Sequence, residues 1–108
     1  MDRIQEKDWK KLRSMEKDLL DKAVGIALSK IRSLIDERQG GNHKTYSALW
    51  DLLRDEDKKI GNMFDDMKRS AAIQEIAFMC KYKIIDEDIL REFSKETQER
   101  INTLIQII

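Results

Sequence analysis

Residues 20–34 read LDKAVGIALSKIRSL, and this stretch decides the fold class. Its apolar side chains recur at intervals of four, three, four and three residues, at Leu20, Val24, Ala27, Ile31 and Leu34. This spacing places them on one face of an α-helix, which has about 3.6 residues per turn. Residues 5–38 contain no proline and a single glycine, so the sequence predicts one continuous helix over 5–38.

A loop is predicted over residues 39–43, because two consecutive glycines follow the basic Arg38, an order typical of the C-terminal end of a helix. From Thr45, which we expect to cap the next helix, apolar residues resume a helical spacing. The second helix is predicted over 45–83. Gly61 offers two alternatives, a kink or a helix end, and the unbroken register across it favours a continuous helix with a kink.

The C-terminal third of the chain predicts a buried segment followed by short helices. Residues 71–80 are apolar on more than one side, so we expect them to be the most buried part of the molecule. Asp86 and the acidic residues after it are typical of a helix N-terminus. A C-terminal helix is therefore predicted over 86–107, and Ser94 can divide it into two by acting as a second N-cap.

Composition agrees with long helices in one domain. Of the 108 residues, 41% are hydrophobic and 39% are charged, with 21 basic and 21 acidic side chains. No stretch alternates apolar and polar residues between turn signals, so no strand is predicted. We predict a single all-α domain over 1–108, a long antiparallel helical hairpin with one or two shorter C-terminal helices. The charge balance argues against a protein whose whole surface binds a polyanion.

The sequence also indicates a cellular location. The lone cysteine, Cys80, cannot form an internal disulfide, which favours a reducing compartment. The N-terminal sequence is charged throughout, and no apolar run approaches the roughly 18 residues that a membrane span needs. We expect a cytoplasmic protein without membrane contact.

Self-association follows from the predicted lengths. A helix over 5–38 is about 50 Å long, and two helices with broad apolar stripes cover one another incompletely. Short C-terminal helices cover only part of that length, so we expect a homodimer in which two chains complete a helical bundle. The residues expected at its interface are Leu20, Val24, Ile31, Ile76, Phe78, Ile101, Leu104, Ile105 and Ile108.

A metal-dependent phosphohydrolase is an alternative hypothesis. Two carboxylates four residues apart share one helical face and can share a divalent cation. All-α pyrophosphohydrolases of the MazG type hold magnesium with carboxylates on facing helices, and the set here is similar in kind, although 51–66 lacks the Glu-x-x-Glu of that family. The candidate ligands are Asp51, Asp55, Asp65 and Asp66. Arginines and lysines three or four positions away can pair with them, so a solvated helix face is the simpler interpretation.

A second alternative is weak nucleic-acid binding through the first helix. Its local basic face comprises Lys10, Lys11, Arg13 and Lys17. Acidic residues are interspersed, so pairing along the helix surface is the simpler interpretation and nucleic acid is not the expected partner.

No catalytic set or cofactor motif is apparent in the sequence. His43 has no nearby cysteine, serine or second histidine, and Cys80 lies in an apolar segment where an inert buried thiol is expected. Aromatic and methionine side chains can form an adaptable docking groove for a partner helix, and the candidates are Trp9, Tyr46, Trp50, Met63, Met67 and Met79. Tyr46 and Trp50 follow the helical phase of their segment, however, so we predict that they pack in the core. The function we expect is that of an accessory or regulatory protein that binds another protein.

Overall fold

The structure is a computed structural model that describes residues 3–108, and over that range it consists of five helices without a strand. The helices are α1 (Glu6–Asp36), α2 (Asn42–Phe64), α3 (Ala72–Lys81), α4 (Glu87–Leu90) and α5 (Lys95–Ile105). The predicted all-α class is confirmed, and so is the long hairpin with shorter C-terminal helices.

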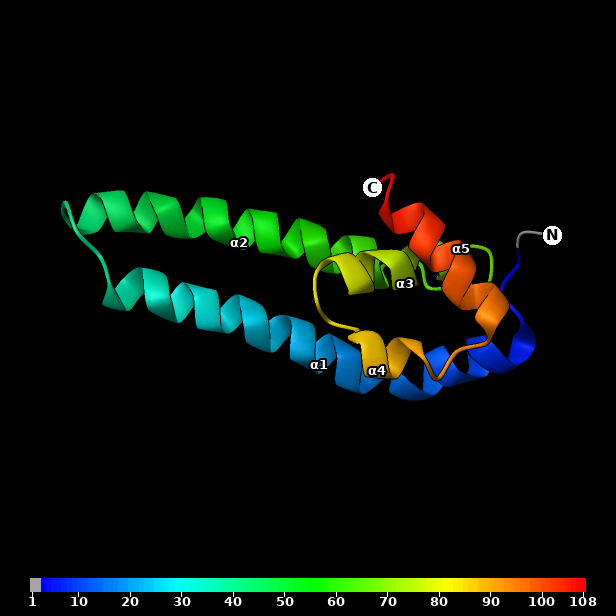
Figure 1. Cartoon of the computed structure of the whole chain (residues 1–108). Coiled ribbons are helices and arrows are strands. Elements are labelled where there is room, and N and C mark those ends of the chain that lie inside the picture. The colour runs from blue at the N-terminus through cyan, green and yellow to red at the C-terminus, as the bar shows by residue number, and fades with distance from the viewer. Residues whose placement is uncertain (1–2) are drawn as a thin grey trace.

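The molecule has two parts that differ in thickness (Figure 1). Helices α1 and α2 run antiparallel, and α3, α4 and α5 gather around only one end of that pair. We call this end the head and the projecting part of the hairpin, residues 28–53, the arm. The molecule is accordingly elongated, with extents of 53 × 24 × 23 Å.

The hairpin turns where the sequence predicts. Helix α1 ends at Asp36, and the next residues turn through Gly40 and Gly41, whose φ angles of 81° and 100° suit glycine. Helix α2 begins at Asn42, directly after this turn, so the expected cap at Thr45 is wrong. The positive φ of the preceding glycine lets the helix start at once, three residues earlier than the sequence suggested.

The continuous helix predicted over 45–83 is wrong, because α2 ends at Phe64 and α3 starts at Ala72. The chain is helical through Gly61 without a break there, and the true stop is Asp65-Asp66. Two carboxylates are unfavourable at the negative end of a helix dipole, and Asp66 adopts a left-handed φ of 56° that aspartate tolerates. The turn folds α3 back onto the hairpin, which covers an apolar segment that a straight helix would expose.

Helix α3 forms the centre of the head, as predicted for residues 71–80. Ala72, Ile76, Ala77 and Met79 are completely buried, between α2 on one side and α5 on the other. Leu12 of α1 and Ile101 of α5 are equally inaccessible and belong to the same apolar core.

Ser94 divides the C-terminal region into two helices, which confirms that alternative. The Asp86 side chain caps α4 by accepting a 2.9 Å hydrogen bond from the backbone N–H of Ile89, and the Ser94 hydroxyl caps α5. A residue 86 positions away reinforces the second cap. The buried Asp8 of α1 accepts hydrogen bonds from the Ser94 N–H (3.0 Å), the Ser94 hydroxyl (2.6 Å) and the Thr97 hydroxyl (2.6 Å). This carboxylate fixes α5 to α1.

Candidate protein-binding surface

The arm carries large apolar side chains on its surface. Leu28, Tyr46 and Trp50 are 59%, 60% and 51% exposed, and the ring of Tyr46 meets that of Trp50 edge to face at 6.4 Å. Ile35 and Leu53 of the arm are also exposed, and so are Leu20 and Val24 on the stretch of α1 that leads into the arm. The prediction that Tyr46 and Trp50 pack in the core is wrong, because no helix of the described chain lies over their side of the arm.

Most of these exposed side chains come directly after a more buried residue in the sequence. On α1, Leu20 follows Leu19, Val24 follows Ala23 and Leu28 follows Ala27, and the first member of each pair is buried. Each exposed residue therefore lies about 100° further round the helix than a buried neighbour, always in the same rotational sense. Helix α1 therefore carries two parallel rows of apolar residues, one exposed and one packed inside the molecule.

Helix α2 repeats this arrangement. Tyr46 follows Thr45 and Leu53 follows Leu52, and in both pairs the first residue is the less exposed one. In an antiparallel helix pair, the same rotational sense on both helices leads to the same side of the pair. The two exposed rows therefore form one surface. We call it the apolar face, and its members, including the half-buried Ile31 and Leu49 between the rows, are Leu20, Val24, Leu28, Ile31, Ile35, Tyr46, Leu49, Trp50 and Leu53.

The base of the arm is held by an ionic cluster around one buried carboxylate. Glu56 of α2 is almost completely buried, and its Oε2 lies 3.1 Å from the Nζ of both Lys30 and Lys59. Burial raises the pKa of Glu56, but the hydrogen bonds from the two lysines outweigh it and hold that pKa below its ordinary value. The cluster joins α1 to α2 and fixes which sides of the two helices face one another. The sequence shows Glu56 only as a polar position within an apolar stripe.

The expected interface residues are divided between the surface and the core. Leu20, Val24 and Ile31 belong to the apolar face. The assignment of Ile76 and Ile101 to an interface is wrong, because both are completely buried by the chain's own helices. The remaining four, which are half-buried and pack against the edge of the core, are Phe78, Leu104, Ile105 and Ile108.

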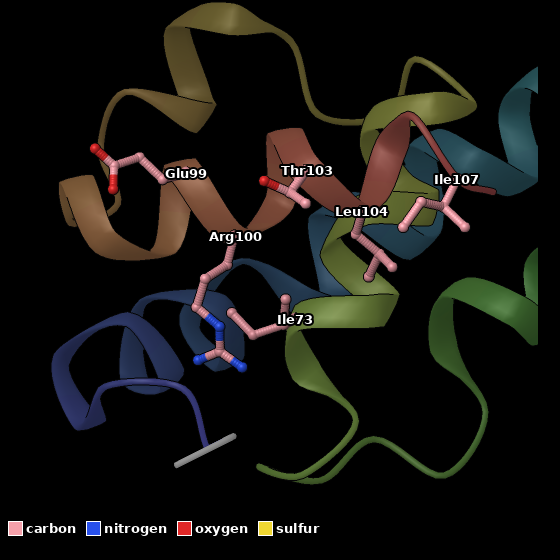
Figure 2. A pocket seen from close by; sticks show the side chains of 6 residues that line it. All are labelled: Ile73, Glu99, Arg100, Thr103, Leu104 and Ile107. Carbon is pink, nitrogen blue, oxygen red and sulfur yellow. The ribbon is translucent and has the colours of Figure 1, made fainter.

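A shallow groove of about 410 Å³ lies at the C-terminal side of the head (Figure 2). Leu104 and Ile107 of α5 lie over it, opposite Ile73 of α3. The Arg100 guanidinium at its edge donates a 3.3 Å hydrogen bond to the backbone oxygen of Arg3. Only three of the residues that line the groove are apolar, and two of them, Ile73 and Leu104, belong to the core or its edge.

The candidate metal ligands are not brought together. Asp51 pairs with Arg54 at 3.2 Å and Asp66 pairs with Lys68 at 3.0 Å, while Asp55 and Asp65 are exposed at different levels of the molecule. Within residues 3–108, no three His, Cys, Asp or Glu side chains lie close enough to hold a metal ion.

One further carboxylate lies in an unusual environment. Glu75 of α3 is buried, and its Oε1 has no hydrogen-bond partner among the described residues. Burial, together with the nearby carboxylates of Asp66 and Glu16, raises the pKa of Glu75 to about 7. The carboxylates that act on Glu75 lie on α1 (Glu16) and directly after α2 (Asp66), so the group belongs to the packing of the head.

The cysteine, the histidine and the basic residues considered in the sequence analysis do not form a reactive or binding cluster among the described residues. Burial, with a smaller effect of Glu87, raises the pKa of the Cys80 thiol to about 11, so it is not a thiolate at neutral pH. His43 is exposed in the first turn of α2. On the basic face of α1, Lys11 pairs with Glu92, and Arg13 lies 5.5 Å from the centre of the Trp9 ring.

None of the helices within residues 3–108 is long and apolar enough to cross a membrane. No protein-family model, no curated protein and no solved structure matches the chain.

Proposed function

We propose that this protein is a small helical interaction module, an accessory or regulatory factor that binds protein through the apolar face of its arm. The observation that supports this proposal most strongly is the exposure of Leu28, Tyr46 and Trp50 on one side of a two-helix arm. A contiguous apolar surface of this kind on a single chain is typical of a binding site. Tryptophan and tyrosine are also the residues that most often dominate the energy of protein interfaces.

The architecture supports a binding role for the arm. The head has a complete core of its own, whereas the arm consists of two helices that bury one stripe each. A two-helix arm exposes its remaining apolar residues to water at a cost of about 25 cal/mol per Å². A partner that covers the apolar face removes this cost, and the outward projection of the arm makes the face accessible to it.

No observation favours either alternative function. The carboxylates of the phosphohydrolase hypothesis are paired or lie apart, as described above. The basic residues of the nucleic-acid hypothesis are interspersed with acidic ones, and Lys11 is already paired with Glu92. Among residues 3–108, neither alternative has the converging side chains that its chemistry needs.

Photo-crosslinking in the native host tests the proposal. A photoreactive amino acid at Leu53 lies on the apolar face, whereas the same amino acid at Asp55, two residues on, points about 200° away round α2. We expect protein adducts from position 53 and few or none from position 55. Equal labelling from the two positions, or no adducts from position 53, contradicts the proposal.

A further inference from the structure

We infer that the occupant of the apolar face is a second copy of this chain, related by a two-fold axis, so that two arms pack face to face as a four-helix bundle. This inference rests on the proposed function, because it names the partner of the same face. Three properties of the apolar face support a second copy as its partner: its width, its area and its charge.

The width of the face matches two helices. Its two rows come from different helices, with Leu28 on the α1 row and Trp50 on the α2 row, and both side chains are more than half exposed. A single docked helix fills the groove between the rows and leaves the outer edges of both uncovered. Another two-helix layer covers both rows, and the chain itself presents such a layer. Packing of four helices in this way is the geometry of four-helix bundles.

The area of the face matches what a dimer needs. From Leu20 to Ile35 the α1 row is about 23 Å long at about 1.5 Å per residue, and from Tyr46 to Leu53 the α2 row is about 11 Å long. Each row is about 10 Å wide, so two faces packed together cover about 700 Å² of flat area. Specific interfaces begin at about 1,000 Å² of total buried surface, and the ridges and grooves of exposed side chains such as Leu28 and Trp50 make the accessible area larger than the flat area. The face is thus of the size at which specific dimers begin.

The charges around the face favour a copy of itself over a charged partner. Between Leu20 and Ile35 the α1 row contains no charged residue, and the nearby arginines already pair within the chain, Arg32 with Asp36 at 3.5 Å and Arg54 with Asp51 at 3.2 Å. An anionic membrane surface or a nucleic acid is attracted by an unpaired basic rim. A second copy brings the same uncharged α1 row and the same paired arginines, while the exposed Asp57 lies just beyond the Leu53 end of the α2 row. The chain also has no net charge to oppose association.

Sedimentation equilibrium of the full chain and two variants tests the inference. At about 50 μM, a concentration at which a dimer with a low-micromolar or smaller Kd is mostly associated, the wild type should have close to twice the 12.8 kDa mass of one chain. Leu28→Glu places two carboxylates in the interface of each dimer and should raise the Kd by about 100-fold or more. Ser33→Glu adds the same charge to α1 away from the apolar face, and this control should remain a dimer.

Circular dichroism of each variant separates loss of association from loss of folding, and Leu53→Lys provides a second substitution on the α2 row. A wild type that sediments as a single chain at about 50 μM, or a dimer that Leu28→Glu and Leu53→Lys leave intact, overturns the inference. If the wild type is a single chain and position 53 still crosslinks to a different protein in the host, the inference fails and the proposed function stands. If neither association nor crosslinking occurs, both fail.

Discussion

Helix α3 in the head and the apolar face are both rich in large apolar residues, but they differ in the number of helices that pack around them. Helix α3 packs against both α2 and α5, and its Ile76 is completely buried. Leu28 and Trp50 of the arm face a side where the described chain has no further helix, and they are more than half exposed. The apolar pattern of a helix therefore shows how much surface has to be covered, and the number of neighbouring helices decides whether one chain can cover it.

Truncation of a core residue in the head should have the largest effect on stability. Ile76→Ala removes completely buried methyl groups and leaves a cavity, so we expect the free energy of unfolding to fall by about 2–5 kcal/mol. Urea denaturation at a protein concentration low enough to populate single chains measures this loss. A change below about 1 kcal/mol contradicts the central position of α3.

Loss of the Asp8 carboxylate should have the next largest effect. Asp8→Ala leaves the Ser94 and Thr97 hydroxyls and the Ser94 N–H without their acceptor in a buried site, which should cost about 2–3 kcal/mol. The matched control is Asp18→Ala, because Asp18 is an exposed aspartate on the same helix and its loss should cost less than about 0.5 kcal/mol. Similar losses for the two variants contradict the role of Asp8 in fixing α5 to α1.

Replacement of the buried Glu75 should increase stability at high pH. Its pKa is raised from 4.5 to about 7 on folding, so the folded chain holds a proton that the unfolded chain loses, and stability falls as the pH rises from about 4.5 through about 7. Glu75→Gln removes this penalty, and we expect the variant to be more stable than the wild type by about 1–2 kcal/mol at pH 8, with the gap shrinking toward pH 4. Thermal unfolding at a series of pH values measures it. A gap independent of pH contradicts the burial of an uncompensated carboxyl group.

Substitution on the apolar face should have the smallest effect on the stability of the single chain. Leu28→Gln removes little buried surface in a monomer, so we expect the free energy of unfolding to change by less than about 0.5 kcal/mol at concentrations where chains are not associated. At higher concentrations the same substitution should lower the melting temperature relative to the wild type, because it weakens the associated state. A large loss at low concentration indicates that Leu28 is covered within the single chain.

Features that depend on nearby residues in the sequence could be predicted from it. The spacing from Leu20 to Leu34 predicted a helix over 5–38, and α1 spans Glu6–Asp36. The helix restart at Ser94 was foreseen as an alternative because the capping hydroxyl and the N–H that it accepts from are three residues apart. Such signals act within one or two helical turns and need no knowledge of the fold.

Features that depend on distant residues could not be predicted in this way. The helix break at Asp65-Asp66 was missed because apolar register continues across it, and the gain from folding α3 back appears only once α5 packs on α3. The buried positions of Asp8 and Glu56 depend on partners 86 and 26 residues away. The exposure of Tyr46 and Trp50 was missed for the same reason, since periodicity identifies an apolar row but not the absence of a helix beside it.

The central claim is that a second copy of the chain covers the apolar face, and the solvent accessibility of Trp50 measures this most directly. Trp50 is half exposed in the single chain, whereas Trp9 is buried in the head, so Trp9→Phe and Trp50→Phe variants report on each ring separately. As the protein concentration rises, acrylamide quenching of Trp50 fluorescence should fall several-fold and its emission should shift to the blue, while Trp9 stays unchanged. Quenching of Trp50 that stays at the level of an exposed tryptophan at every concentration contradicts the account.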